Sequence, residues 1–144
     1  MNKQIYFDMD GTIADLYGVE GWLDMLINED TTPYEIARPL CNLQVLARRL
    51  NRLQKDGYTI GIITWLSKTA TAEYDEKVAR AKRVWLKKHL ATVKFDEIHI
   101  VRYGTPKHEI GKGILFDDEE QNRRGWGEGA YTEKEIFEVL KGLA

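Results

Sequence analysis

Two carboxylates, Asp8 and Asp10, follow a short apolar run over residues 4–7 and precede Gly11 and Thr12. A run of β-branched and aromatic residues that leads into glycine is typical of a buried strand entering a loop, so both acids are expected at one strand end. Two acids separated by one residue repel each other unless a positive charge lies between them. A hard divalent cation with oxygen ligands would allow both to be ionised, and Mg²⁺ is the natural choice.

Two other interpretations of this motif are a calcium-binding loop and an ordinary turn. The EF-hand loop requires glycine at its sixth position and glutamate at its twelfth, where counting from Asp8 gives Ile13 and Val19. The pattern therefore excludes that class of calcium site. A solvated turn after an edge strand stays open, because Asp and Gly are common turn residues.

The composition is that of one globular domain. The 144 residues are 43% hydrophobic, which is enough for a substantial core and leaves little room for a second domain. The net charge of −2, with mixed signs, gives no reason to expect a stable nucleic-acid partner held by bulk electrostatics. Cys41 is the single cysteine, so no internal disulfide can form, as is common in a reducing compartment.

No apolar stretch reaches the roughly 20 residues of a membrane span, and the first strand begins directly after residues 1–3, without a signal-peptide pattern. We therefore expect a cytoplasmic protein with no membrane partner. The sequence does not decide whether the chain forms homo-oligomers.

Strand-like and helix-like segments alternate along the chain. Apolar runs predict strands at residues 4–7, 58–63, 97–101 and 113–116, and periodic apolar residues predict helices at 40–53, 73–89 and 132–143. Such alternation predicts an α/β fold, a three-layer Rossmann-like parallel sheet with helices on both faces. We expect residues 1–144 to form one domain. A small helical cap is expected after the first strand at about 15–39, with a helix at 16–26 that breaks at 28–33.

Polar residues accompany two further strands of this predicted sheet. Thr64 ends the second strand, Asp117 and Asp118 follow the fourth, and Lys107 lies in the loop before the fourth. Because the carboxyl ends of parallel strands meet at one edge of a sheet, these side chains are expected beside the two early acids. Several acids, a hydroxyl and an ammonium group at one edge describe a metal-assisted phosphate site.

The order Asp8–Thr12, Thr64, Lys107, Asp117–Asp118 resembles the four-motif signature of the haloacid dehalogenase superfamily. The match spans nearly the whole chain, and motif type, order and strand context agree. Within that superfamily, the short insertion and the ten residues from Lys107 to Asp117 resemble the 5′(3′)-deoxyribonucleotidases and their phage and bacterial relatives. The segment 81–89 is also similar to the lysine- and tryptophan-bearing helix of those enzymes.

The resemblance implies a phosphatase in which Asp8 attacks phosphorus and forms an aspartyl-phosphate, while Asp10 protonates the leaving oxygen and later takes a proton from water. It implies Mg²⁺ held by the Asp8 side chain, the Asp10 carbonyl and the late pair Asp117 and Asp118, with Asp118 as the direct ligand. Thr64 and nearby N–H groups would hold the phosphate oxygens.

Lys107 and Lys82 are alternatives for the lysine of the third motif. We prefer Lys107, as a point charge that neutralises the phosphate, because of its interval to Asp117. Lys82 would then be a second substrate contact, or one charge on a solvated helix face. Gly11 would permit the substrate to approach the backbone closely. Thr64 alone would be an ordinary strand residue, and only its position singles it out.

The insertion at 15–39 is too small for a full lid, which favours substrates that cover the metal themselves. Four aromatic residues could stack on a base or could merely pack in the fold: Tyr17, Trp22, Tyr34 and Trp65. Trp65 stands where the resembled nucleotidases carry a small polar residue, and Glu119 stands where they carry arginine. Loss of that arginine removes a donor for an anionic substrate.

We therefore expect a Mg²⁺-dependent phosphomonoester hydrolase that acts on a small phosphorylated substrate, a (deoxy)nucleoside monophosphate. The alternative substrate is a phosphorylated nucleic-acid end or a sugar phosphate. The alternative of another class is a non-catalytic phospho-acceptor like a response-regulator receiver. Motif order argues against it, because a receiver carries its paired acids at the first strand, whereas here the pair comes last.

Overall fold

Within residues 3–68 and 70–143, which the computed structural model describes, five strands form one parallel sheet. The sheet order is β5-β4-β1-β6-β7. Its strands are β1 (Gln4–Phe7), β4 (Thr59–Trp65), β5 (Glu97–Val101), β6 (Ile114–Phe116) and β7 (Ala130–Tyr131). The four expected strands are all present. β7 is not predicted from the sequence, because a strand of two residues is too short to show an alternating pattern of apolar residues.

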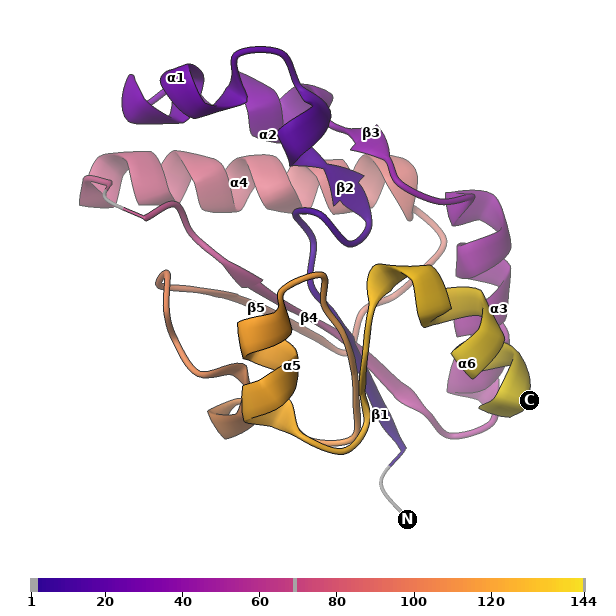
Figure 1. The fold of residues 1–144 in the computed structure, drawn as a ribbon. Coiled ribbons are helices and arrows are strands. Elements are labelled where there is room, and N and C mark those ends of the chain that lie inside the picture. The colour runs from indigo at the N-terminus through magenta and orange to yellow at the C-terminus, as the bar shows by residue number, and fades with distance from the viewer. Residues whose placement is uncertain (1–2, 69, 144) are drawn as a thin grey trace.

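Helices cover both faces of this sheet, which confirms the expected α/β fold (Figure 1). α3 (Leu43–Lys55), α6 (Ile136–Leu143) and the second half of α4 (Ala72–His89) share one apolar core with β1, β4 and β6. α5 (Glu120–Trp126) lies on the other face, where Trp126 packs near Tyr6. α4 begins where the sequence predicts, because the hydroxyl of Thr71 accepts from the backbone N–H of Tyr74.

The segment between β1 and α3 forms short helices and a two-stranded ribbon, and we call this segment the cap. It contains β2 (Ala14–Asp15), a 3₁₀ turn (Leu16–Gly18), α1 (Trp22–Ile27), α2 (Thr32–Ile36) and β3 (Arg38–Pro39). β2 and β3 pair antiparallel where the cap leaves the sheet domain. The expected single helix at 16–26 is instead a 3₁₀ turn followed by α1, because Gly21, with φ of 75°, interrupts the helical path.

The cap packs on the first half of α4 (Figure 1). Leu16 and Tyr34 of the cap form a buried cluster with Tyr74, Val78 and Ala81 of α4. At the start of α4, the hydroxyl of Tyr74 also donates to the carbonyl of Asp30 at 2.9 Å. The cap therefore has a fixed support beside the carboxyl ends of the strands.

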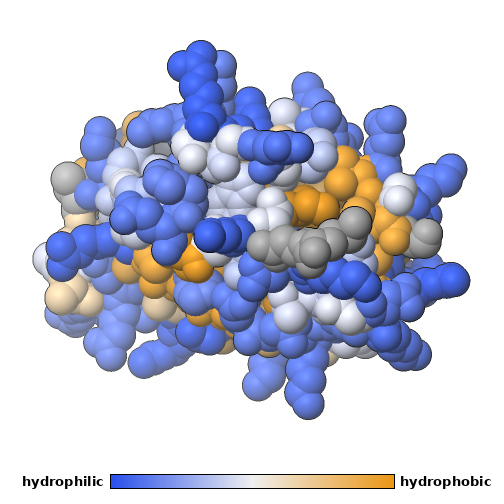
Figure 2. All heavy atoms as spheres, turned by 90° about the horizontal axis from the view of Figure 1, so that it is seen from below, coloured by the Kyte–Doolittle hydropathy of each residue, from blue (hydrophilic) through white to orange (hydrophobic). Residues whose placement is uncertain are grey.

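The opposite side of the protein, at the amino ends of the strands, is largely hydrophilic with smaller apolar areas (Figure 2). Four of the large apolar side chains exposed in the described chain instead lie on or near the cap and line the cavity described below: Tyr17, Leu23, Ile27 and Tyr103. Among the described residues, none of the helices combines the length and apolar character that a membrane crossing requires.

Candidate active site

Lys107 joins two acids that come from different strands. Its Nζ donates to Asp8 Oδ1 at 3.0 Å and to Asp117 Oδ2 at 2.7 Å, and the residue is 3% exposed. Asp8 follows β1, Asp117 follows β6, and Lys107 begins a 3₁₀ turn between β5 and β6. Burial alone lowers the pKa of Lys107, but the charges of Asp8 and Asp117 raise it overall, so the ammonium group stays charged.

The two late acids differ in their surroundings. Asp117 is fully buried, and besides Lys107 it accepts from Asn122 Nδ2 at 3.1 Å and from the backbone N–H of Glu119 at 2.9 Å. Asp118 is partly exposed, and its Oδ1 accepts from the hydroxyl of Thr12 at 3.2 Å. Asp117 is thus engaged by protein donors, whereas Asp118 keeps capacity to bind a ligand.

Carboxylate oxygens of Asp8, Asp117 and Asp118 all lie within 4.8 Å of one another. The hydroxyl of Thr12 lies between the early and late acids, 3.3 Å from Asp8 Oδ2. Burial, reinforced by the charge of Asp8, raises the pKa of Asp118 to about 8 and that of Asp117 to about 6. Without a cation, these clustered acids resist ionisation because their charges repel one another. A hard cation that binds carboxylate oxygens would remove this repulsion, so these residues fit Mg²⁺.

Asp10 lies beside this cluster but pairs with a different lysine. Lys82 Nζ donates to Asp10 Oδ2 at 2.8 Å, to Thr64 Oγ1 at 2.6 Å and to the carbonyl of Trp65 at 2.7 Å. Lys82 is 1% exposed, so the interpretation of this residue as one charge on a solvated helix face is wrong. Burial raises the pKa of Asp10 although Lys82 acts in the opposite direction, which favours a carboxyl group that can carry a proton.

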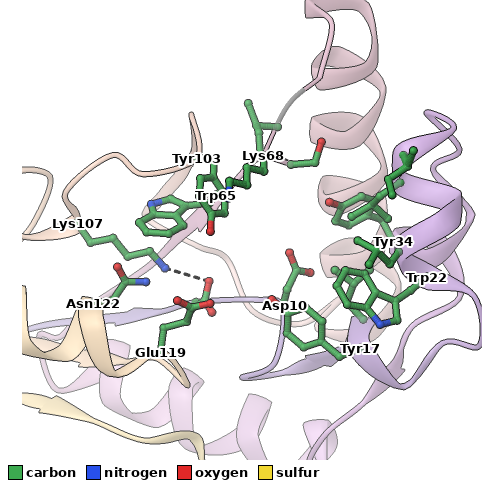
Figure 3. Close-up of a pocket in the computed structure, with 17 residues that line it drawn as sticks. Asp10, Tyr17, Trp22, Tyr34, Trp65, Lys68, Tyr103, Lys107, Glu119 and Asn122 are labelled. Carbon is green, nitrogen blue, oxygen red and sulfur yellow. Dashed lines mark hydrogen bonds and ion pairs between the residues drawn. The ribbon is translucent and has the colours of Figure 1, made fainter.

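A cavity of about 520 Å³ opens from these residues between the cap and the sheet domain. Tyr17, Trp22 and Tyr34 of the cap line one side, and Trp65 and Tyr103 line the other, with Asp10 between the two groups (Figure 3). A volume of this size is typical of a small-molecule site. The walls are mainly apolar and aromatic, and Asp8, Asp10 and Lys107 are among the polar residues that line the cavity.

The expected site residues thus come together from the ends of β1, β4 and β6, from α4 and from the 3₁₀ turn that begins at Lys107. Among them, Asp8, Asp10, Trp65 and Lys107 line the cavity. Trp65 lines the cavity, donates through Nε1 to the carbonyl of Thr105 at 2.9 Å and lies with its ring over Lys107. Thr12 and Asn122 also belong to the site, although the sequence analysis assigns neither of them a role. Thr12 could have been found, since its hydroxyl follows the two acids directly, whereas Asn122 carries no recognisable pattern.

Gly11 has a φ of 83°, and a Cβ at this position would lie 2.3 Å from Asp118 Oδ2. We expect Gly11→Ala to displace the Asp118 carboxylate, to weaken Mg²⁺ binding at least about tenfold and to destabilise the fold by roughly 1–2 kcal/mol. Isothermal titration with Mg²⁺ and thermal unfolding measure both effects.

Gly104 offers a matched control for this substitution. Its φ is 87°, but a Cβ there would meet nothing within 4 Å. Gly104→Ala should therefore show the backbone strain without the loss of Mg²⁺ affinity. Equal Mg²⁺ affinities for the two variants would contradict a direct role of Gly11 in placing Asp118.

The raised pKa values of Asp117 and Asp118 predict how pH acts on the metal-free protein. A carboxyl group whose pKa is higher in the folded than in the unfolded state binds its proton more tightly when the protein is folded. Its contribution to stability is fully present at pH values below the unfolded pKa of 3.8 and is lost as pH rises through the folded pKa values of about 6 and about 8. Metal-free protein should therefore lose stability between about pH 4 and pH 8. Mg²⁺ should raise the Tm more at pH 8 than at pH 5, and Asp118→Asn should abolish most of this difference.

No family model matches the chain, and no curated protein does either. Among solved structures, the chain is similar to D,D-heptose 1,7-bisphosphate phosphatase from B. bronchiseptica complexed with magnesium and phosphate, with a TM-score of 0.60 and 13% identity over 99% of both chains. The enzyme of the same name from Burkholderia thailandensis gives a TM-score of 0.55 and 14% identity, over 99% of this chain and 98% of that one. These similarities extend over the whole chain and show a shared fold.

Proposed function

We propose that this protein is a Mg²⁺-dependent phosphomonoester hydrolase of the haloacid dehalogenase superfamily, with a nucleoside monophosphate as its substrate. The observation that carries this proposal is that Asp8, Asp10 and Lys107 line one cavity, with a carboxylate oxygen of Asp118 within 4.8 Å of one of Asp8. The likeness to two phosphatases, one of them complexed with magnesium and phosphate, supports the same class of reaction.

Asp8 is the proposed nucleophile. One of its carboxylate oxygens forms a bond to phosphorus as the bond from phosphorus to the ester oxygen breaks, which gives an aspartyl-phosphate. Asp10 donates its proton to the departing oxygen, so that the leaving group departs as an alcohol. Lys107, which is hydrogen-bonded to Asp8, places a fixed positive charge beside the transferred phosphoryl group.

The second half of the reaction reverses the role of Asp10. Its carboxylate accepts a proton from water as the water oxygen attacks phosphorus, and the bond from phosphorus to Asp8 breaks. Phosphate leaves, and Asp8 and the protonated Asp10 are regenerated. Mg²⁺ held by Asp8, Asp118 and the carbonyl of Asp10 would supply charge neutralisation for the phosphate oxygens.

The walls of the cavity support a substrate with a planar, weakly polar leaving group. Five aromatic side chains line it, and Lys68 and Lys107 are its only lysines among the described residues. Lys107 is already engaged by two acids, so Lys68 is the one lysine of the described lining that remains for a second phosphate group, if a substrate carried one. A nucleoside suits such walls because every base has a face that can stack on aromatic rings.

A sugar phosphate is the second candidate substrate, because the similar solved structures are phosphatases named for a heptose bisphosphate. Glu119 lines the cavity and would accept a hydrogen bond from a sugar hydroxyl, which suits either a sugar phosphate or the ribose of a nucleotide (Figure 3).

Phosphate release from a panel of substrates tests the proposal. The panel contains deoxyribo- and ribonucleoside 5′- and 3′-monophosphates, a hexose phosphate, a heptose bisphosphate and a 3′-phosphorylated oligonucleotide, each with Mg²⁺ and with a chelator. We expect Mg²⁺-dependent release, with the highest kcat/KM for nucleoside monophosphates. Inactivity across the whole panel would refute the function. A preference for the sugar phosphates, or a stable phosphoprotein without turnover after acetyl phosphate treatment, would assign the site to an alternative instead.

Tyr103→Leu separates the two substrate classes further. Tyr103 is about half exposed, lines the cavity and packs with Trp65 at 4.9 Å between ring centroids. Loss of this ring should raise the KM for nucleoside monophosphates about tenfold and leave that for a small sugar phosphate nearly unchanged.

A further inference from the structure

Lys82 uses all of its hydrogen-bonding capacity within the protein. An ammonium group has three hydrogens, and Lys82 has three acceptors at 2.6 to 2.8 Å, namely Asp10 Oδ2, Thr64 Oγ1 and the Trp65 carbonyl. No hydrogen is left for a phosphate oxygen. A direct substrate contact, which the sequence suggests for this residue, would require one of these bonds to break.

The side chain is also held in place by its surroundings. Lys82 lies on α4 between two buried residues, Ala81 and Trp85, and its ammonium group lies 5.3 Å from the ring centre of Tyr34 in the cap. Trp85 in turn donates through Nε1 to the carbonyl of Ala37 at 2.8 Å, which fixes this part of the helix against the base of the cap. The ammonium group therefore sits at a defined point between the helix, the cap and the ends of two strands.

We propose that Lys82 is a positioning residue that holds Asp10 and Thr64 in their reactive orientations and does not touch the substrate. This inference rests on the proposed function. The proposed role of Lys82 differs from that of Lys107. Lys107 donates a hydrogen bond to the nucleophile Asp8, whereas Lys82 donates to Asp10, the proposed acid and base.

The contact with Lys82 determines which oxygen of Asp10 carries the proton. Oδ2 accepts from Lys82, and an ammonium group has no acceptor for a hydrogen on Oδ2, so the proposed role assigns the proton to Oδ1 when the pair is intact. In the proposed reaction, Oδ1 would then donate to the leaving oxygen. In the same way, Thr64 Oγ1 accepts from Lys82, so its own hydrogen is directed elsewhere and is available to a phosphate oxygen.

A comparison of two substrates isolates this role. p-Nitrophenyl phosphate releases a stable anion and needs no proton from Asp10 to form the aspartyl-phosphate, whereas a nucleoside monophosphate releases an alcohol that does. With Lys82→Met we expect kcat/KM for the nucleoside monophosphate to fall about 10²- to 10³-fold and that for p-nitrophenyl phosphate to fall less than about tenfold. Hydrolysis of the aspartyl-phosphate still needs Asp10 as a base. The variant should therefore show a burst of p-nitrophenolate followed by slow turnover, with kcat and KM both lowered.

Lys87→Met is the matched control, because Lys87 lies on the same helix and is exposed. It should leave both substrates unaffected. If Lys82→Met does not fold, Lys82→Gln, which keeps a polar head group, undergoes the same measurements. Equal losses of kcat/KM of about 10²-fold or more for the two substrates would overturn the inference, because a direct phosphate contact would serve both.

A double-mutant cycle gives a second, independent readout. If Lys82 acts through Asp10, Lys82→Met should cost little further activity in an Asp10→Asn background, whereas a direct phosphate contact predicts the same loss in both backgrounds. Failure of the proposed function is distinct from failure of this inference. The former shows as a wild-type protein inactive on all phosphomonoesters, and the latter as an active wild type whose variant loses both substrates equally.

Discussion

Replacing Asp8 with asparagine is expected to abolish turnover, by about 10⁴-fold or more, while the fold persists. An amide oxygen cannot attack phosphorus as a carboxylate does, so the covalent intermediate cannot form. Asparagine has nearly the same shape, and its Oδ1 can still accept from Lys107, so the buried ammonium group keeps this hydrogen-bond acceptor. Phosphate release and thermal unfolding of the same preparation measure both effects.

Asp56 provides a control for this change of an acid to an amide. It is exposed at the end of α3, away from the cavity. Asp56→Asn should retain full activity. Substantial turnover by Asp8→Asn, above about a tenth of the wild-type rate, would show that another group attacks phosphorus.

Lys107→Met is expected to cost both activity and stability. Lys107 separates Asp8 from Asp117 in a buried position, and its loss leaves two neighbouring acids without their cation. Breaking a buried pair in this way destabilises a protein by roughly 3–5 kcal/mol, and we expect turnover to fall on the order of 10³-fold or more. Because one acid must then take up a proton, the loss of stability should be larger at pH 8 than at pH 5.

The exposed Lys112, which lies a few residues further along the chain, is the control for this lysine substitution. Lys112→Met should unfold at the wild-type denaturant concentration at both pH values, as measured by chemical denaturation. Added Mg²⁺ should restore part of the stability of Lys107→Met, since a cation held by Asp8 and Asp118 offsets the same repulsion. An unchanged stability of Lys107→Met would mean that water or local rearrangement satisfies Asp117.

Much of the sheet could be predicted because its strands are short apolar runs that end in polar residues. Gln4–Phe7, Glu97–Val101 and Ile114–Phe116 lie where the sequence places them. The rule that parallel strands bring their carboxyl ends to one edge then places the acids, Thr64 and Lys107 together without coordinates. The positions of the acids and Thr64 follow from topology, since each residue sits at or near the end of a strand, whereas the 3₁₀ turn between β5 and β6 brings in Lys107.

Other parts of the site could not be predicted because they depend on tertiary contacts. Helical periodicity places Lys82 on a helix but does not say that its ammonium group reaches across to Asp10 and Thr64. The face on which Lys82 lies becomes buried because the cap and the ends of β1 and β4 both pack against it. β7 and α2 are likewise too brief for a periodic signal, and they form because neighbouring elements support them.

The central place of β1 between β4 and β6 has a consequence for the folding kinetics. The three strands that carry the acids and the hydroxyl are neighbours in space but are separated along the chain by the cap and by the helical crossovers. Contacts between such distant segments form late in folding. Because Mg²⁺ would need ligands from the ends of both β1 and β6, its site is complete only once these two strands have paired in register. Mg²⁺ should therefore slow unfolding strongly and accelerate folding little, so that magnesium prolongs the lifetime of the native chain rather than guiding its assembly.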